Sequence, residues 1–327
     1  MTSGMKTTKF LFKFCILLIL LIVVSFLFIL FVPKSINNVN TNLLKKVLLD
    51  IRLVELLTSI VAGFILGLSG CLMQTVLNNL LASPFTLGTQ ASAAFGASIA
   101  ILEIIPFATN LPISLVAFLA SSTSIFILIL LISFFGESKQ TIIIAGVAIN
   151  FMFNAGNSLL KYFATLDKLY DMTFWTYGSF QTSRYQDVGL MLIIFLVGIL
   201  FSILMANDLT QISLGEKIAI SAGINVKRTR ILILLIASLL ASVSVSSVGV
   251  IGFIGLVAPF FSRLLGLSHP KFLIFSTPLI GAILLVTANS FSKIILQPVI
   301  LPVGAITSLL GVPCLLFIMI FTRKKHV

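Results

Sequence analysis

Cys15-Ile-Leu-Leu-Ile-Leu-Leu-Ile-Val-Val-Ser-Phe-Leu-Phe-Ile-Leu-Phe31 is the stretch that decides the fold, because Ser25 is its one polar residue apart from the cysteine thiol. In a membrane-spanning barrel, strand residues alternate between apolar and polar side chains, and this run does not alternate. Inside a bilayer every backbone N–H and C=O must be paired within the protein, which leaves the helix as the other spanning structure. The stretch therefore predicts an all-α membrane protein.

The same composition continues along the whole chain. Of its 327 residues, 59% are hydrophobic and 9% are charged, whereas soluble domains are roughly a quarter charged. A helix that crosses the hydrocarbon core needs about 20 apolar residues. Ten apolar blocks approach or reach this length, at about residues 14–32, 53–73, 86–105, 112–135, 141–163, 188–206, 230–249, 252–267, 272–292 and 302–322. We expect a polytopic protein with about ten transmembrane helices in a single membrane domain over residues 1–327.

The first apolar block follows several lysines, as the apolar region of a signal peptide does. It is longer than such a region, which usually has about 7–15 residues, and Pro33-Lys34 offers no small-residue cleavage site. We therefore expect a retained first helix, and an even number of helices would place both termini on one side.

The basic residues predict the orientation. The formal net charge is +12, from 21 Lys and Arg against 9 Asp and Glu, but no solvated basic domain indicates nucleic-acid binding. Cytoplasmic loops of membrane proteins carry an excess of Lys and Arg. With the N-terminus inside, thirteen basic residues fall in inner loops and eight in outer loops. We expect cytoplasmic termini, an inner hydrophilic segment at about 207–230 and an outer loop at about 162–187.

Polar side chains share one face of the fifth apolar block. Asn150, Asn154, Asn157 and Lys161 recur at i, i+4, i+7 and i+11, which places them on one side of a helix. Polar groups inside membrane helices face the bundle interior or a water-filled path. Two interpretations stay open: hydrogen bonds between helices, or the lining of a translocation path.

Small residues recur every four positions in the second and third blocks, as Ser59, Gly63 and Gly67, followed by Gly70, and as Gly88, Ser92, Gly96 and Ala100. Small side chains let helix backbones approach closely, and close packing is what holds helices together in lipid. We interpret these residues as packing seams.

No motif for catalysis or metal binding is present in the sequence. It has no GxxxxGK[ST], HExxH or GxSxG. Cys15, Cys71 and Cys314 show neither metal-ligand spacing nor a disulfide framework. We expect no enzyme, no metal site and no cofactor, so that any transport would draw its energy from an ion gradient or from another chain.

Several glycine- and proline-containing segments follow one another in a recognisable order. They are Ser69-Gly70 with Gln74, Asn79-Leu-Leu-Ala-Ser-Pro-Phe-Thr-Leu-Gly88, Ala145-Gly-Val-Ala148, Trp175-Thr-Tyr-Gly-Ser179, Leu209-Thr-Gln-Ile-Ser-Leu-Gly-Glu-Lys-Ile-Ala-Ile-Ser-Ala-Gly-Ile-Asn-Val-Lys227, Gly249-Val-Ile-Gly-Phe-Ile-Gly-Leu-Val-Ala-Pro259 and Leu301-Pro-Val-Gly-Ala-Ile-Thr-Ser-Leu-Leu-Gly-Val-Pro313. From about residue 52 to 322 the chain resembles the FecCD-type permeases. These are membrane subunits of ABC importers for ferric siderophores, haem and cobalamin.

The resemblance implies a type II ABC importer architecture with ten helices per subunit. It implies a homodimer or close heterodimer around a central path, two ATP-binding subunits that hold ATP and Mg, and an external binding protein. It also implies a bacterial inner membrane. In that setting we expect the solute to be an iron chelate, such as a ferric siderophore or a ferric citrate-like complex, with haem or cobalamin as the alternative.

The resemblance also assigns residues to roles. It implies an ATPase-coupling segment with Gly215, Glu216, Ala219, Ser221, Ala222 and Gly223. Asn79 and Leu81 would lie at the cytoplasmic gate, next to the path that the asparagines of the fifth block could line. Arg52 and Lys293 would contact the binding protein.

Four positions depart from the family pattern. Glu55 stands where the family has an arginine, and Leu80 replaces a proline. Phe260 replaces a histidine, and Asn289 replaces an aspartate that precedes the basic residue at 293. The change at Glu55 alters the expected pattern of docking charges.

A transporter of a different class, an ion-coupled carrier or a channel, remains an alternative from the residues alone. Such a protein needs an ion-coordinating group within the membrane. The sequence offers Glu55 and Glu103 near the ends of apolar blocks, and neither lies in mid-helix. A membrane scaffold without transport activity is a third interpretation, which the coupling segment disfavours.

Overall fold

The computed structural model describes residues 2–31, 47–104 and 111–323, and within these ranges its regular structure is helical throughout. The elements in chain order are α1 (Thr2–Phe31), η1 (Val47–Leu53), α3 (Val54–Leu77), α4 (Thr89–Ile101), α5 (Ile113–Phe135), α6 (Lys139–Phe163), α7 (Leu166–Tyr177), α8 (Tyr185–Leu204), α9 (Ala206–Leu214), α10 (Glu216–Ser221), α11 (Val226–Val248), α12 (Ile254–Leu264), α13 (Pro270–Ile294) and α14 (Val303–Arg323). The predicted all-α class is confirmed.

Each of the ten predicted apolar blocks coincides with a helix. Among the described residues, seven helical stretches are long and apolar enough to cross a membrane, namely α1, η1 with α3, α5, α6, α8, α11 and α13. By contrast, α4 has 13 residues and α12 has 11. The chain is a multi-pass membrane protein, and ten is an approximate number of crossings because some apolar helices are too short to span alone.

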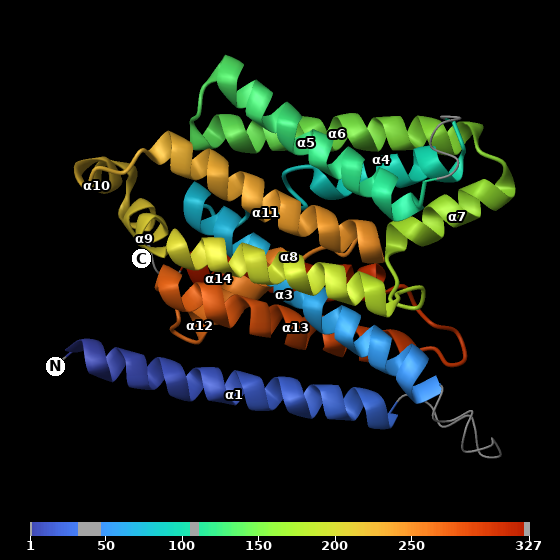
Figure 1. Ribbon diagram of the computed structural model, residues 1–327, viewed down its shortest axis with the longest axis horizontal. Helices are drawn as coiled ribbons and strands as arrows, with labels where there is room; N and C mark the ends of the chain where they lie inside the picture. The colour runs from blue at the N-terminus through green and yellow to red at the C-terminus, as the bar shows by residue number, and fades with distance from the viewer. Residues whose placement is uncertain (1, 32–46, 105–110, 324–327) are drawn as a thin grey trace.

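Helix α3 lies in the middle of the bundle. Its sides are covered by α8, α11, α12 and α13, so that nearly every residue from Val54 to Leu77 is buried. Helix α1 lies along one edge against α13, and α5 and α6 lie at the opposite edge (Figure 1). An apolar helix that is buried all round is expected at the centre of a large bundle.

The predicted packing seams hold α3 against its neighbours. A Cβ added to Gly70 would lie 1.7 Å from the carbonyl oxygen of Gly255 in α12, and one added to Gly63 would lie 2.5 Å from the Cα of Ala282 in α13. In the third block, a Cβ on Gly96 would lie 2.4 Å from the Cβ of Ala120 in α5. These backbones are in direct contact, which confirms the interpretation of the small residues.

The two hydrophilic segments lie at opposite ends of the bundle. Helices α9 and α10 lie at the end where both chain termini are marked, and α7 lies toward the other end (Figure 1). We call these the α10 end and the α7 end. Placement of both termini at one end agrees with the even number of apolar blocks.

Replacement of Gly70 by alanine should destabilise the bundle, because no atom can enter the contact with Gly255 without moving backbone. Overpacking of this kind costs about 1–3 kcal/mol. The thermal unfolding midpoint of the detergent-purified protein measures the loss. Gly189→Ala in α8 is the matched control, since a Cβ there meets nothing within 4 Å. Equal midpoints for the two variants would contradict the proposed contact.

Candidate coupling, gate and outer sites

Two glycines set the path of the predicted coupling segment. Gly215 separates α9 from α10 at a φ of +132°, and Gly223 follows α10 at a φ of +79°. An added Cβ meets no atom within 4 Å at either position, so the requirement is conformational and not steric. A positive φ is readily adopted by glycine and strained for most other residues. The short helix α10 is therefore set off from its neighbours by two turns that favour glycine.

Helix α10 has one buried and one exposed side. Ala219 is fully buried and packs with Leu209 and Ile212 of α9 in the main apolar core. Ile218 and Ile220 are 48% and 63% exposed, and Leu214 beside them is 61% exposed. The other predicted coupling residues, Ser221, Ala222 and Gly223, are also exposed. This apolar surface lies at the α10 end, where it suits contact with another protein.

Glu216 ties α10 to the rest of the bundle. Its Oε1 lies 2.5 Å from Nη2 of Arg230 in α11 and 3.6 Å from Nζ of Lys139 at the start of α6. Burial raises the pKa of Glu216, but the hydrogen bond and charge of Arg230, with a smaller effect of Lys139, outweigh it and lower that pKa below its ordinary value. The carboxylate is therefore ionised at neutral pH.

The predicted gate residues lie in the loop between α3 and α4, at the α10 end. Asn79 Oδ1 accepts a hydrogen bond of 2.9 Å from the backbone N–H of Leu81. The Leu81 side chain is 54% exposed. Asn79 also lines a polar cavity of about 230 Å³ together with Arg263 of α12 and Ser213 of α9. The structure therefore brings the gate loop close to α9.

The asparagines of α6 divide into two sets. Asn157 is buried, and its Oδ1 lies 2.5 Å from Ser98 Oγ in α4. Asn154 is exposed and donates to Asn150 Oδ1 at 2.7 Å, while Asn150 Nδ2 donates to the Phe85 carbonyl in the gate loop at 2.8 Å. Asn157 thus joins two helices, whereas Asn150 and Asn154 face a side of α6 that this chain leaves open. Each of the two interpretations fits part of the stripe.

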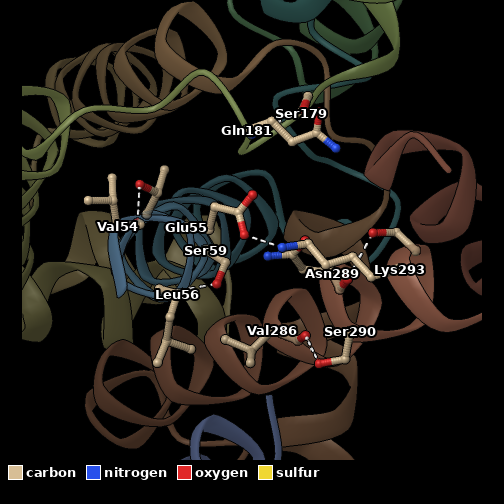
Figure 2. A network of polar contacts seen from close by, with 12 residues as sticks. Val54, Glu55, Leu56, Ser59, Ser179, Gln181, Val286, Asn289, Ser290 and Lys293 are labelled. Atoms are coloured by element: carbon tan, nitrogen blue, oxygen red, sulfur yellow. Dashed lines mark hydrogen bonds and ion pairs between the residues drawn. The ribbon is translucent and has the colours of Figure 1, made fainter. Parts of the chain in front are cut away.

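The predicted docking residues lie near the α7 end, but the side chain of Lys293 is not at the surface. It is 7% exposed and forms an ion pair with Glu55 of α3, whose side chain is 5% exposed. Figure 2 shows the Glu55 carboxylate pointing toward the nitrogens of Lys293 and Asn289. The Lys293 ammonium also lies 4.9 Å from the centre of the Phe28 ring in α1. Arg52 is partly exposed in η1.

This ion pair corrects the expectation for Lys293, because a buried and paired ammonium is not available for direct contact with a binding protein. It also accounts for two departures from the family pattern. The acidic partner of the basic residue stands on α3 as Glu55, and the usual acidic position on α13 is the neutral Asn289. Charge balance is kept, since a buried charge without a partner is costly.

A second cavity, of about 430 Å³, opens at the α7 end. Its lining includes Trp175 and Asp171 of α7, the pair Lys168–Glu103 and Gly249. Lys168 Nζ lies 2.7 Å from Glu103 Oε1, and the hydrogen bond and charge of Lys168 hold the pKa of Glu103 below its ordinary value. Glu55 and Glu103, the carboxylates that an ion-coupled carrier could have used, are thus both engaged by lysines.

Arg230 and Phe253 are not among the predicted site residues. Phe253 has a φ of +67°, stacks on Phe85 of the gate loop at 6.2 Å between ring centres, and packs against Gly311 of α14. Its signal in the sequence is the motif Gly249–Pro259, which belongs to the family resemblance. Arg230 is a basic residue at the start of an apolar block, which is a signal for a buried charge with a partner.

Loss of Lys293 should destabilise the protein more than loss of an exposed lysine. Lys293→Met leaves Glu55 buried and unpaired, which costs about 3–5 kcal/mol, whereas Glu55→Leu with Lys293→Met removes both charges and should recover most of that loss. Lys227→Met is the control, because Lys227 is 61% exposed and 3.9 Å from Glu137. The measurement is the unfolding midpoint in detergent. A double variant as unstable as Lys293→Met would refute the buried pair.

Comparison with known proteins places these features in a family. The model described as the FecCD transport family matches residues 11–321. The chain is 31% identical over 304 residues to the hemin transport system permease protein HmuU of Yersinia pestis, covering 90% of this chain and 89% of that protein. It is 32% identical over 282 residues to the vitamin B12 import system permease protein BtuC of Yersinia enterocolitica, covering 85% and 82%.

A solved structure has the same arrangement of helices. It is described as an inward-facing conformation of a metal-chelate type ABC transporter and matches with a TM-score of 0.83 and 26% identity, covering 95% of this chain and 99% of that chain. The family and structural matches decide against an ion-coupled carrier or channel. The chain belongs to the FecCD transport family and is a membrane permease of an ABC importer, a transport component.

Proposed function

We propose that the chain imports an iron chelate across the bacterial inner membrane, driven by ATP hydrolysis on two separate ATP-binding subunits that hold ATP and Mg. The observation that carries the proposal is α10. This helix presents exposed Ile218 and Ile220 at the α10 end of the bundle. Its other side is held by the ion pair of Glu216 and by the buried Ala219. An exposed apolar face on a firmly held short helix suits a docking contact.

The open side of α6 supports a second permease copy. In a membrane helix of 25 residues, an exposed Asn154 next to a half-buried Asn150 would be costly against lipid. A second copy of the chain, or a close relative, would enclose these amides around a shared path. We therefore propose a homodimer or close heterodimer in which Asn150 and Asn154 line the path and Leu81 lies at its gate.

The chemistry of the relatives supports the class of solute. Hemin, vitamin B12 and a metal chelate, the substances in the names of the matched proteins, are all organic complexes of a metal. We propose an iron chelate such as a ferric siderophore or a ferric citrate-like complex, with haem or cobalamin as the alternative. An external binding protein would deliver the solute to the α7 end, where the large cavity opens and Arg52 is partly exposed.

The charges at the α10 end support the direction. Lys13 of α1 donates to the carbonyl of Leu265, between α12 and α13, and so lies at this end. Lys139, Lys227 and Arg230 lie at the same end. An excess of Lys and Arg is typical of the cytoplasmic side. We propose that this end and both termini are cytoplasmic.

Reconstitution tests the proposal directly. Proteoliposomes with the cognate ATP-binding subunit and binding protein should accumulate a radiolabelled ferric siderophore when ATP is enclosed, with haem and cobalamin tested in parallel. Accumulation should stop when either partner is omitted and should continue when a protonophore collapses the proton gradient at constant ATP. Accumulation that needs the gradient but not ATP would refute the proposal, and accumulation of haem or cobalamin alone would refute the solute.

A bulky side chain on the docking surface should uncouple the importer. Ala222→Arg adds volume at an exposed position with a φ of −84°, so it introduces no backbone strain. Gly223→Arg would be harder to interpret, because Gly223 has a positive φ. We expect ATP-driven accumulation to fall at least about tenfold, which corresponds to 1.4 kcal/mol of lost docking energy.

Ala222→Ser is the matched control, since it adds one oxygen atom at the same site and should retain transport. The amount of ATP-binding subunit that co-purifies with each variant is measured alongside. Full transport and full co-purification with Ala222→Arg would show that α10 is not the docking helix.

A further inference from the structure

Arg230 connects three separate elements at the α10 end. It lies near the start of α11, and its side chain is 3% exposed. Nη2 bonds Glu216 in α10, and Nη1 donates to the backbone carbonyl of Glu137, in the loop before α6, at 2.7 Å. A guanidinium holds two acceptors in one rigid plane. Arg230 thus fixes the start of α10 relative to the start of α6.

Lys139 provides a second connection to the same carboxylate. It is the first residue of α6, and Ser138 before it caps that helix by accepting a hydrogen bond of 3.1 Å from the N–H of Thr141. The main helix contacts of α10 are otherwise with α9 and α11. Glu216 therefore links α10 to the first residue of α6 through Lys139.

Helix α6 continues the connection to the gate loop. Asn150 lies eleven residues after Lys139, or about 16 Å along the helix, and bonds the carbonyl of Phe85. A helix transmits a displacement of its end along its length, because its backbone hydrogen bonds keep it stiff. A shift of Glu216 would thus reach the loop that carries Asn79 and Leu81.

We propose that Arg230 is a positioning residue that transmits displacement of α10 to α6 and so to the gate loop. The inference rests on the proposed docking of an ATP-binding subunit at α10. Separation of Arg230 from Glu216 would leave the buried guanidinium poorly paired, so α11 and α10 move together instead of sliding apart. Arg230 is too buried to touch the ATP-binding subunit itself, which separates its role from docking.

The experiment measures movement of α6 and needs no solute. Spin labels on cysteines at Ile144 of α6 and Leu200 of α8, both exposed, report the distance between these helices. The background replaces Cys15, Cys71 and Cys314 by alanine. The complete complex with its ATP-binding subunits is compared without nucleotide and with ATP and vanadate. The variants are Arg230→Gln, Glu216→Ala and both together, with Lys227→Gln as control, because Lys227 is exposed and contacts only the Glu137 side of the cluster.

We expect ATP and vanadate to change the distance in the parent complex and in Lys227→Gln. In Arg230→Gln the population of the shifted state should fall at least about fivefold, the lower end of the coupling found between linked sites. The ATP-binding subunits should still co-purify with this variant. The double variant should lose no more than Glu216→Ala alone, because Glu216 contacts both Arg230 and Lys139 and its loss already breaks the connection.

Three results would overturn the inference. They are an undiminished shift in both Arg230→Gln and Glu216→Ala, additive losses in the double variant, and a loss in Arg230→Gln that is matched by loss of the ATP-binding subunits. The last would show that Arg230 only supports the fold of the docking segment. A parent chain that recruits no ATP-binding subunit would instead refute the proposed function.

Discussion

Close backbone contact around α3 is the constraint on which the rest of the structure depends. Lipid tails are as apolar as the side chains, so apolar side chains gain little by leaving the lipid for another helix. Helices in a bilayer therefore associate mainly through close packing. Gly63, Gly67 and Gly70 bring α3 against α12 and α13 with no side chain between the backbones. This contact fixes how α3 and α13 are rotated about their axes. It thereby decides that Glu55 and Lys293 meet in the protein interior.

Ion pairs stabilise the two ends of the bundle in different ways. At the α7 end, Glu55 and Lys293 are both buried, and Phe28 covers the ammonium of Lys293. At the α10 end, Arg230 is buried but Glu216 is 43% exposed. The first pair joins two spanning helices, which favours rigidity. The second joins a spanning helix to a short surface helix, which suits a contact that has to respond to a partner.

Much of the fold could be predicted from the sequence, and less of the candidate site. The helical blocks follow from apolar length, because lipid allows an isolated chain segment no other way to pair its backbone. The position of α10 between Gly215 and Gly223 follows from the motif, since both residues adopt a positive φ. For Lys293 the resemblance implies contact with the binding protein, and the sequence does not reveal its buried partner Glu55, which is 238 residues away in the chain.

The sequence by itself determined that the protein crosses a membrane several times, that its ten apolar blocks form helices, and to which family it belongs. These properties depend on local composition and on the order of short motifs. Tertiary structure alone decided that Asn157 bonds α4 while Asn154 faces outward, and that Arg230 holds Glu216. Helical periodicity places the asparagines on one side, but the packing of neighbouring helices sets which part of that side is covered. Charges find their partners only when distant segments are brought together.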